Sequence, residues 1–281
     1  PENITHIYGN TFENCEKFQH IELPQGLEYI GKEAFKGCTL IKKTVIPKNV
    51  KQVDDGAFSM CINLENVEFE GEPLYIGNSF YDTKYYNSIK EDKYSCKYIG
   101  NHLIELVDKK RGKVIIKDGT VSIANNAFSK SKIREIVFSK ELKMIGESAL
   151  GHCYRLEDVG FPDGLIYISK LCFIDCRNLK RVYIPKSVED VGESILLGSG
   201  NVKEVIVSKE QLNTSVQSAM KNTLNQHLEQ LVWNDACEPH QEVKSEFSKM
   251  LATSNTSQRV KDMANKLFIA THFQTIKNEQ L

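Results

Sequence analysis

Cysteine and histidine are the residue types in this chain best suited to metal binding, disulfide formation or nucleophilic chemistry. The sequence contains 8 Cys and 7 His. His152, Cys153, Cys172 and Cys176 could supply the four ligands of a zinc ion. Their spacing is a weak zinc signal, because a regular interval between repeats already accounts for three of these four residues.

That interval is 23 residues, and it defines a column of cysteines. Equivalent positions in stacked repeats lie side by side with parallel Cα–Cβ bonds, which places their Cβ atoms about 4.8 Å apart or more. A disulfide needs a closer approach. We therefore expect free, buried thiols that act as small hydrophobic side chains. Cys96 and Cys237 lie outside the column and are the candidates for a reactive or bridging thiol. The column consists of Cys15, Cys38, Cys61, Cys153 and Cys176.

Other signatures of catalysis are missing from the sequence. The histidines form no metalloprotease motif, and no glycine-rich phosphate loop follows a candidate strand. No nucleophile elbow presents a serine. We predict no catalytic residue, no cofactor and no metal site, and a hydrolase is the last of the functions considered.

The 23-residue period extends well beyond the cysteines. Phe12, Phe35 and Phe58 share it, and so do Ile168 and Val191. The aligned unit reads Val-x-x-Ile-Gly-x-x-Ala-Phe-x-x-Cys-x-x-Leu-x-x-Val-x-Ile-Pro, with its clearest copy at 27–47. Several independent columns on one period are the sequence signature of a stacked repeat protein.

This unit resembles the BspA-like subgroup of leucine-rich repeats, which occurs in surface proteins of bacteria and some protozoan parasites. The resemblance extends from Ile7 to about Val207. Leu150 replaces the Phe and Cys172 the Ala, and both substitutions keep the position apolar. The resemblance implies a right-handed leucine-rich-repeat solenoid of the α/β class, with a parallel sheet on its concave face.

The strand, proline and glycine positions of the unit also agree with a stack of repeats. Each unit ends in the alternation of a half-buried strand, and the following Pro has no amide to continue the ladder. Gly31, Gly146 and Gly192 mark turns that a side chain would obstruct. One rung cannot bury its own apolar edge, so neighbouring rungs must form a continuous core. The predicted strands are Phe18–Leu23, Ile41–Ile46, Leu64–Phe69, Ile133–Phe138, Leu156–Phe161, Leu179–Ile184 and Val202–Val207.

The middle of the chain departs from the repeat. Leu64 and Ile133 are three periods apart, so about two further rungs are expected between them, one ending at residues 114–116. Residues 78–98 form an irregular insertion rich in Tyr and Lys. We predict a strand or hairpin over Tyr98–Leu106.

After residue 208 the period gives way to helical spacing. Leu212, Val216, Leu224, Leu228 and Leu231 share one face of a predicted helix. A second helix is predicted after Pro239 and a third around residues 260–273. We therefore divide the chain into a solenoid at 1–208 and a helical tail at 209–281. The tail either caps the last rung or mediates self-association.

Variable residues between the apolar columns are the candidate partner-binding residues. Lys180, Arg181 and Tyr183 combine two charges and an aromatic ring on one rung, and such residues are enriched among interface hot spots. The alternative is a solvated face whose opposite charges relieve repulsion between rungs. The other candidates are Glu157 and Asp158 on the neighbouring rung, Lys42 and Lys43 in the N-terminal half, and Tyr85 and Tyr86 in the insertion.

Composition restricts the partners. The 36 basic and 37 acidic residues nearly cancel, so no charge excess favours nucleic acid. No apolar run is long enough for membrane insertion, and the first residues lack the pattern of a signal peptide.

We predict a non-catalytic protein-interaction module. The resemblance implies a cell-surface or secreted protein acting in adhesion or host contact, although a cytoplasmic location stays open. Two alternatives remain. One is an intracellular scaffold or sensor that assembles through the helical tail. The other is a glycan-binding module that uses the tyrosine-rich insertion. The sequence does not fix the oligomeric state.

Overall fold

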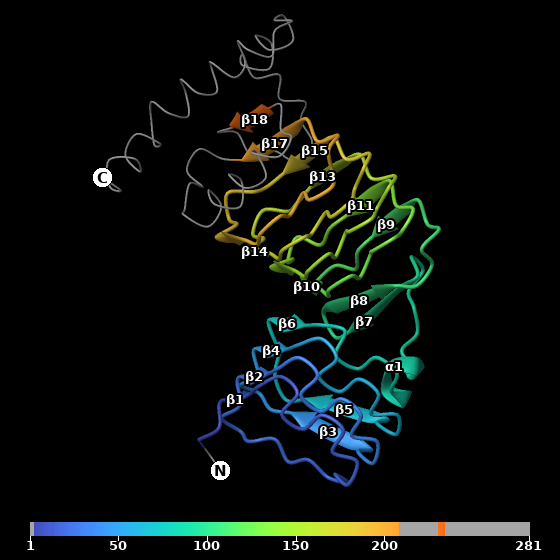
Figure 1. Ribbon diagram of the computed structural model, residues 1–281, viewed down its shortest axis with the longest axis vertical. Helices are drawn as coiled ribbons and strands as arrows, with labels where there is room; N and C mark the ends of the chain where they lie inside the picture. The colour runs from blue at the N-terminus through green and yellow to red at the C-terminus, as the bar shows by residue number, and fades with distance from the viewer. Residues whose placement is uncertain (1–2, 208–229, 234–281) are drawn as a thin grey trace, which may run out of the picture.

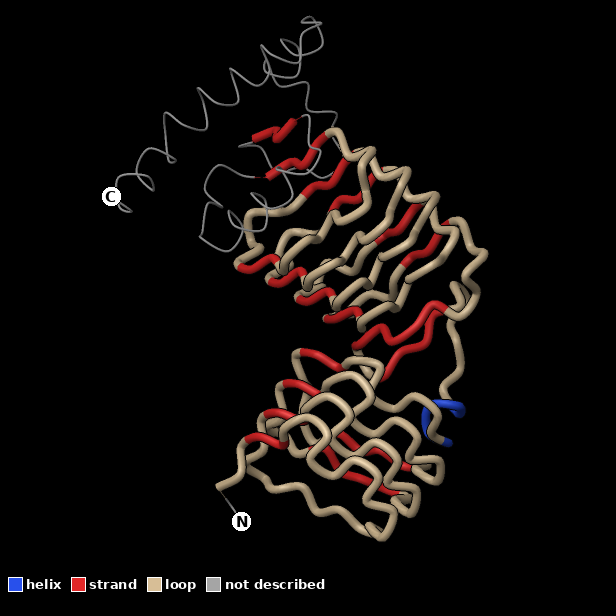
Figure 2. Tube along the Cα trace, viewed as in Figure 1, coloured by secondary structure: helices blue, strands red, loops and turns tan. Residues whose placement is uncertain are grey.

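The computed structural model describes residues 3–207 and 230–233. Over these residues the chain winds into a stack of rungs, each made mostly of turns that join two short strands (Figures 1 and 2). The strands of successive rungs pair in parallel. The predicted solenoid of stacked repeats is therefore confirmed.

The longer strands form one side of the stack. β3 and β5 pair with each other, β9 pairs with β11, and β13, β15, β17 and β18 form a four-stranded sheet. Six of the seven predicted strands are present, each within two residues of its predicted ends. These longer strands are β3 (Lys43–Ile46), β5 (Asn66–Phe69), β9 (Lys113–Ile115), β11 (Glu135–Val137), β13 (Asp158–Gly160), β15 (Arg181–Tyr183), β17 (Glu204–Val207) and β18 (Gln230–Trp233).

A second series of two-residue strands lines the opposite side, where the glycines of the sequence had indicated only turns. Each one ends in the Ile or Val of the repeat, so the Ile168 and Val191 column was its signal. The short strands are β1 (His6–Ile7), β2 (Tyr29–Ile30), β4 (Gln52–Val53), β6 (Tyr75–Ile76), β10 (Ser122–Ile123), β12 (Met144–Ile145), β14 (Tyr167–Ile168) and β16 (Asp190–Val191).

Glycine directly follows four of the short strands, β2, β6, β12 and β16, and lets neighbouring rungs approach closely. A Cβ on Gly192 would lie 2.2 Å from the backbone nitrogen of Lys170, and one on Gly31 would lie 2.5 Å from that of Gly9. Such separations are far below van der Waals contact, so only glycine fits. The predicted role of these glycines is confirmed.

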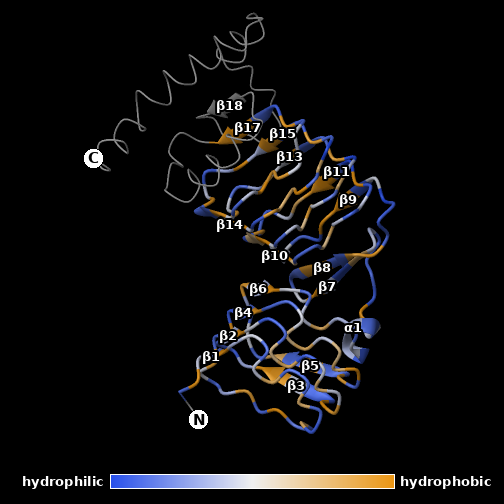
Figure 3. Ribbon diagram, in the orientation of Figure 1, coloured by the Kyte–Doolittle hydropathy of each residue, from blue (hydrophilic) through white to orange (hydrophobic). Residues whose placement is uncertain are grey.

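The aromatic column forms a stack through the first rungs. The rings of Phe12, Phe35, Phe58 and Phe80 lie 5.0 to 5.4 Å apart between successive centroids, with interplanar angles of 4° to 14°. Phe35, Phe58 and Phe80 are at most 1% exposed. Hydrophobic residues (orange) are frequent along the strands of the ribbon in Figure 3, whereas hydrophilic residues (blue) are frequent in the turns.

The insertion divides the stack into two blocks. We call residues 4–82 the N-terminal block and residues 113–207 the C-terminal block. Between them lie the five-residue helix α1 (Lys84–Ser88) and an antiparallel hairpin of β7 (Cys96–Ile99) and β8 (His102–Leu106). The hairpin predicted over Tyr98–Leu106 is therefore confirmed, with its first strand starting two residues earlier.

The hairpin separates two hydrophobic cores. Leu103 and Leu106 pack into the core of the C-terminal block, whereas Ile99 and Ile104 pack into that of the N-terminal block. All four side chains are at most 2% exposed. A strand buried on both faces does not show the alternation of apolar and polar residues that marks a half-buried strand. The repeat pattern is therefore lost at this point in the sequence.

The stack bends at the insertion, with the short strands on the inside (Figure 1). β6 lies against β10 there, since Tyr75 Oη donates a hydrogen bond of 2.9 Å to Asn125 Oδ1. Asn125 also donates to the Asp55 carboxylate. On the other side α1 and the hairpin separate β5 from β9. The predicted placement of the longer strands on a concave face is therefore wrong, because the inserted residues spread the rungs apart on that side.

Two further predictions fail at the ends of the described structure. Phe18–Leu23 is not a strand, and Phe18 and Ile21 of this first rung are only half-buried. The predicted helix containing Leu231 is wrong at its end, because residues 230–233 form β18, which pairs in parallel with β17. β18 supplies hydrogen-bond partners to a strand that would otherwise be an edge. The sheet thus continues past the predicted boundary at 208.

The other predicted tail helices, and with them the helical cap, lie at 208–229 and 234–281, outside the described residues. Among the residues that are described, no helix has the length and apolar character needed to cross a membrane.

Candidate interaction surface

The strands of the C-terminal block carry two rows of outward-facing residues. We call this surface the strand face. It consists of the outward residues of β11, β13, β15 and β17 and the residue before each strand. One row is apolar and places Gly160 between Val137 and Tyr183, with Ile206 beyond. The other row is charged and includes Glu135, Asp158, Arg181 and Glu204.

Ion pairs join neighbouring rungs along the charged part of the strand face. Lys180 Nζ lies 2.6 Å from Glu157 Oε2. Arg181 donates to both carboxylate oxygens of Asp158, at 2.7 and 3.2 Å. The four side chains are 50 to 56% exposed, and the hydrogen bond that Lys180 donates to Glu157 raises the pKa of Lys180. The structure therefore brings four predicted site residues together as two ordered pairs.

Tyr183 does not have the exposed position that was expected of a central anchor. Only 7% of it is accessible, although Arg181 on the same strand is exposed. Its partner in the sheet register is Gly160, which has no side chain to hold the ring away from the sheet. Tyr183 thus contributes to packing more than to accessible surface.

The two predicted site lysines of the N-terminal block lie elsewhere. Lys42 is exposed just before β3, and Lys43 is exposed on β3 beside Asn66 of β5. That two-stranded sheet is separate from the sheet of β13 and β15. The structure does not bring Lys42 and Lys43 together with Lys180 and Arg181.

The tyrosines of the insertion are mainly structural. Tyr86 is 4% exposed, and its hydroxyl donates to the Glu105 carboxylate. Tyr85 is half-buried, with its ring edge against Phe80 at 5.5 Å between centroids. A sugar-stacking platform needs accessible ring faces, and among the tyrosines of the predicted insertion at 78–98 only Tyr81 is exposed, at 48%, in the last corner of the N-terminal block. The geometry therefore weakens the glycan-binding alternative.

The ladder cysteines do more than fill space. Cys38 Sγ donates to the Phe12 carbonyl at 3.1 Å, and Cys61 Sγ donates in the same way to Phe35. Ser199 fills the same column and donates to Phe173 at 2.6 Å. The column therefore selects a small hydrogen-bond donor, and the expectation of purely hydrophobic thiols was incomplete.

The described cysteines are free thiols. The prediction of Cys96 as a reactive or bridging thiol is wrong, because Cys96 is 0% exposed and burial raises its pKa to about 12. Cys237 lies outside the described residues, and Cys15 of the first rung is only half-buried. Within the described part of the chain, no group of three or more Cys, His, Asp or Glu side chains could hold a metal ion.

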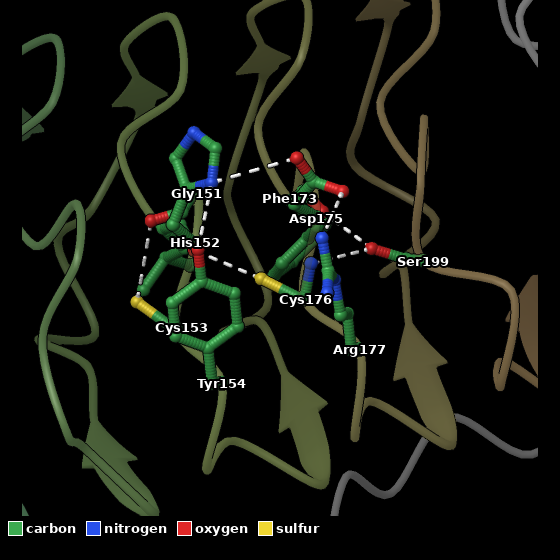
Figure 4. A network of polar contacts seen from close by, with 10 residues as sticks. Gly151, His152, Cys153, Tyr154, Phe173, Asp175, Cys176, Arg177 and Ser199 are labelled. Carbon is green, nitrogen blue, oxygen red and sulfur yellow. Dashed lines mark hydrogen bonds and ion pairs between the residues drawn. The ribbon is translucent and has the colours of Figure 1, made fainter.

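A cluster at the turn corners was missed by the sequence analysis. His152, Tyr154, Asp175 and Arg177 come from two neighbouring rungs and converge on one exposed corner (Figure 4). His152 Nδ1 lies 3.6 Å from Asp175 Oδ2 and 3.3 Å from Tyr154 Oη. These residues flank the Cys153 and Cys176 column, and their side chains vary from rung to rung. This variability between rungs was the sequence feature that could have indicated the cluster.

The corners share an unusual backbone. In the turns that lead to a Cys or Ser of the column, two residues four positions apart have positive φ, and the second directly precedes the column; before Thr83 only Asp82 has positive φ. This left-handed conformation reverses the chain and directs the flanking side chains outward. Examples are Glu33 and Gly37, Gly56 and Met60, Ser148 and His152, Leu171 and Asp175, and Ser194 and Gly198.

These features define a class of protein, a solenoid of parallel repeats that holds variable side chains on a regular backbone. The chain belongs to the BspA type Leucine rich repeat region family, which matches residues 1–107 and 108–226 in 6 copies. No curated protein sequence matches the chain.

Several solved structures are similar. A leucine rich cell surface protein from Faecalibacterium prausnitzii is 20% identical, over 78% of this chain and 73% of that one, with a TM-score of 0.36. A leucine-rich repeat protein from Bacteroides ovatus is 20% identical over 84% and 76%, with a TM-score of 0.37. The pneumococcal vaccine antigen PcpA is 16% identical over 84% and 78%, with a TM-score of 0.39.

Proposed function

We propose that this chain is a non-catalytic protein-interaction module that acts at a cell surface or after secretion, in adhesion or host contact. The observation that carries the proposal is the strand face, where the Lys180–Glu157 and Arg181–Asp158 pairs lie beside an apolar row. Paired charges are held in fixed positions before a partner arrives. Extended solenoid surfaces of this kind are how repeat proteins usually bind.

The structure changes which of the predicted residues we expect to contact a partner. Lys180 and Arg181 remain the central anchors, because both are exposed and ordered by their carboxylate partners. Glu157 and Asp158 would disfavour uniformly acidic partners. Tyr183 supports the face from within, since it is 7% exposed.

Binding of the labelled chain to intact cells tests the proposal. Cells are treated with protease or with glycosidase before the chain is added, and we expect only protease to abolish binding. For the partner isolated from such cells, Lys180→Ala with Arg181→Ala should raise the Kd by about 30-fold, which corresponds to about 2 kcal/mol.

The matched control is Lys51→Ala with Lys170→Ala, which also removes two cations from ion pairs between rungs, Lys51–Glu28 and Lys170–Glu147. This control should leave the Kd within about twofold, since Lys51 and Lys170 lie beside the short strands β4 and β14 and not on the strand face. Binding that survives protease but not glycosidase would contradict the proposal. So would equal losses in the two double variants.

A further inference from the structure

The corner of the C-terminal block carries a basic and aromatic surface separate from the strand face. Lys132, Tyr154 and Arg177 occupy one column in three successive rungs, each directly after the Ser131, Cys153 or Cys176 position. All three are exposed, Tyr154 at 45% and the Arg177 side chain at 70%. We call this surface the corner patch. It consists of Lys130, Lys132, His152, Tyr154, Arg155, Asp175, Arg177 and Leu197.

The contacts between rungs hold the patch in one arrangement. His152 N donates to the Ile174 carbonyl at 2.6 Å, and Asp175 N donates to that of Leu197 at 2.8 Å. The Arg177 guanidinium lies over the Tyr154 ring, 5.9 Å from its centroid. Asp175 Oδ1 is 3.9 Å from this guanidinium. The Arg177 side chain is 70% exposed, so most of its five N–H donors face solvent.

The charge of the patch is strongly biased. Four side chains, Lys130, Lys132, Arg155 and Arg177, are basic, against the single carboxylate of Asp175. The acidic residues on the adjoining strand face do not offset this charge, because Glu157 and Asp158 are already paired with other cations. Anions near the corner therefore meet a net positive potential.

The backbone at the corner shows that the turn itself does not need the His152 side chain. His152 and Asp175 have φ values of 57° and 54°, whereas glycine fills the same column at Gly37 and Gly198. Glycine adopts this conformation without steric cost, and a histidine does not. The side chain of His152 is therefore not required by the turn, and it contacts both Tyr154 and Asp175.

We propose that the corner patch binds an acidic, extended peptide segment of a partner protein. Partner carboxylates would pair with Arg177 and Lys132 across the Tyr154 ring. Asp175 would accept a hydrogen bond from a backbone N–H of the peptide, and Leu197, 40% exposed on the next rung, would contact an apolar side chain. A densely sulfated glycan fits less well, because it would place like charge against Asp175 without amide donors.

The test uses the whole chain and a fluorescent synthetic peptide in which Glu and Asp alternate with Leu, with binding followed by anisotropy. Arg177→Glu should weaken binding by about tenfold or more, as expected for a central interface arginine. Tyr154→Ala should weaken it by about fivefold, whereas Tyr154→Phe, which keeps the ring, should retain most of the affinity.

The matched control is Lys51→Glu, the same kind of charge reversal in the N-terminal block, where Lys51 is also exposed and ion-paired. It should change the affinity by less than about twofold, and all variants should melt like the wild type, because the altered side chains are exposed. Lys180 and Arg181 are intact in every variant, so failure here leaves the strand-face proposal to its own test.

Three outcomes would overturn the inference. The first is no binding of the acidic peptide by the wild-type chain. The second is an equal loss with Lys51→Glu, which would indicate unspecific attraction. The third is heparin, a sulfated glycan probe, binding more tightly than the peptide and depending on Arg177, because the corner would then select a polyanion.

Discussion

The N-terminal and C-terminal blocks use the same rung for different surfaces. In the N-terminal block the aromatic column is a stack of phenylalanines, and the corners expose Leu40, Met60, Ile62 and Tyr81. In the C-terminal block Leu150 and Leu196 enter that column, and the corners carry the corner patch. In the interior column one apolar residue therefore replaces another, whereas the corner positions carry apolar, polar or charged side chains. The rungs therefore provide the stable interior, and the corners and the strand face are the surfaces that we propose for partner binding.

The largest expected effect concerns the aromatic column. Phe58 is 0% exposed and stacks on a ring in each neighbouring rung, at 5.0 and 5.4 Å. Phe58→Ala should cost roughly 3–5 kcal/mol of unfolding free energy, and Leu150→Ala about 3 kcal/mol. Urea denaturation measures both values.

Hydrogen exchange then shows where stability is lost. Because the hairpin separates the two cores, Phe58→Ala should lower protection mainly in the N-terminal block, and Leu150→Ala mainly in the C-terminal block. A uniform loss across both blocks would show that they unfold as one unit. Unchanged stability in either variant would contradict the assigned repeat register.

The boundary between the blocks should respond to acid. His102 on β8 is 1% exposed, its Nδ1 is 2.8 Å from Ser122 Oγ, and burial lowers its pKa to about 4. The folded protein disfavours the protonated ring, so the stabilisation is complete above the usual pKa of about 6.5 and is lost as the pH falls toward 4. At about pH 5 the loss should approach 2 kcal/mol relative to neutral pH.

His102→Asn is the matched variant, because its amide can keep the bond to Ser122 without titrating. Urea denaturation at about pH 7.5 and pH 5 should show a smaller acid destabilisation in the variant, with the difference close to that 2 kcal/mol. Equal acid sensitivity of the two proteins would assign the effect to the carboxylates instead.

A smaller change in stability should distinguish the two roles of the cysteine column, donation of a hydrogen bond and filling of the core. Cys61 donates to the Phe35 carbonyl at 3.1 Å in the N-terminal block, as Ser199 donates to Phe173 in the C-terminal block. Cys61→Ser should therefore stay within about 0.5 kcal/mol of the wild type, whereas Cys61→Ala should lose about 1 kcal/mol with the hydrogen bond. Equal losses in thermal melts of the two variants would show that volume, and not the donor, determines this column.

The smallest expected effect is a stabilisation. Met60 has a φ of 59° and is 49% exposed at a corner of the N-terminal block, in the column where Gly198 stands in the C-terminal block. Met60→Gly removes the steric cost of the left-handed conformation, about 1–2 kcal/mol, and increases the entropy of the unfolded chain by roughly half as much. A gain of about 0.5 kcal/mol in urea denaturation should result. A loss would show that the Met60 side chain packs usefully on its neighbours.

Much of the rung could be predicted from the sequence because its determinants are local and periodic. The 23-residue columns located six of the longer strands, the glycine turns and the buried Phe and Cys positions. The short strands were missed, because two residues between turns are too few to show alternation. The hairpin was located only approximately, because burial on both faces removes its polar positions.

Contacts between distant residues decided what the sequence alone could not. The bend depends on bonds such as that from Asn125 to Asp55, which are 70 residues apart, and on inserted residues that spread one side of the stack. The same holds for the candidate surfaces. Glu157 and Asp158 pair with Lys180 and Arg181 only through stacking, Tyr183 is buried beside a glycine of another rung, and Arg177 meets Tyr154 across a rung boundary. The period determines which residues share a column, whereas the geometry between rungs determines which side chains a partner can reach.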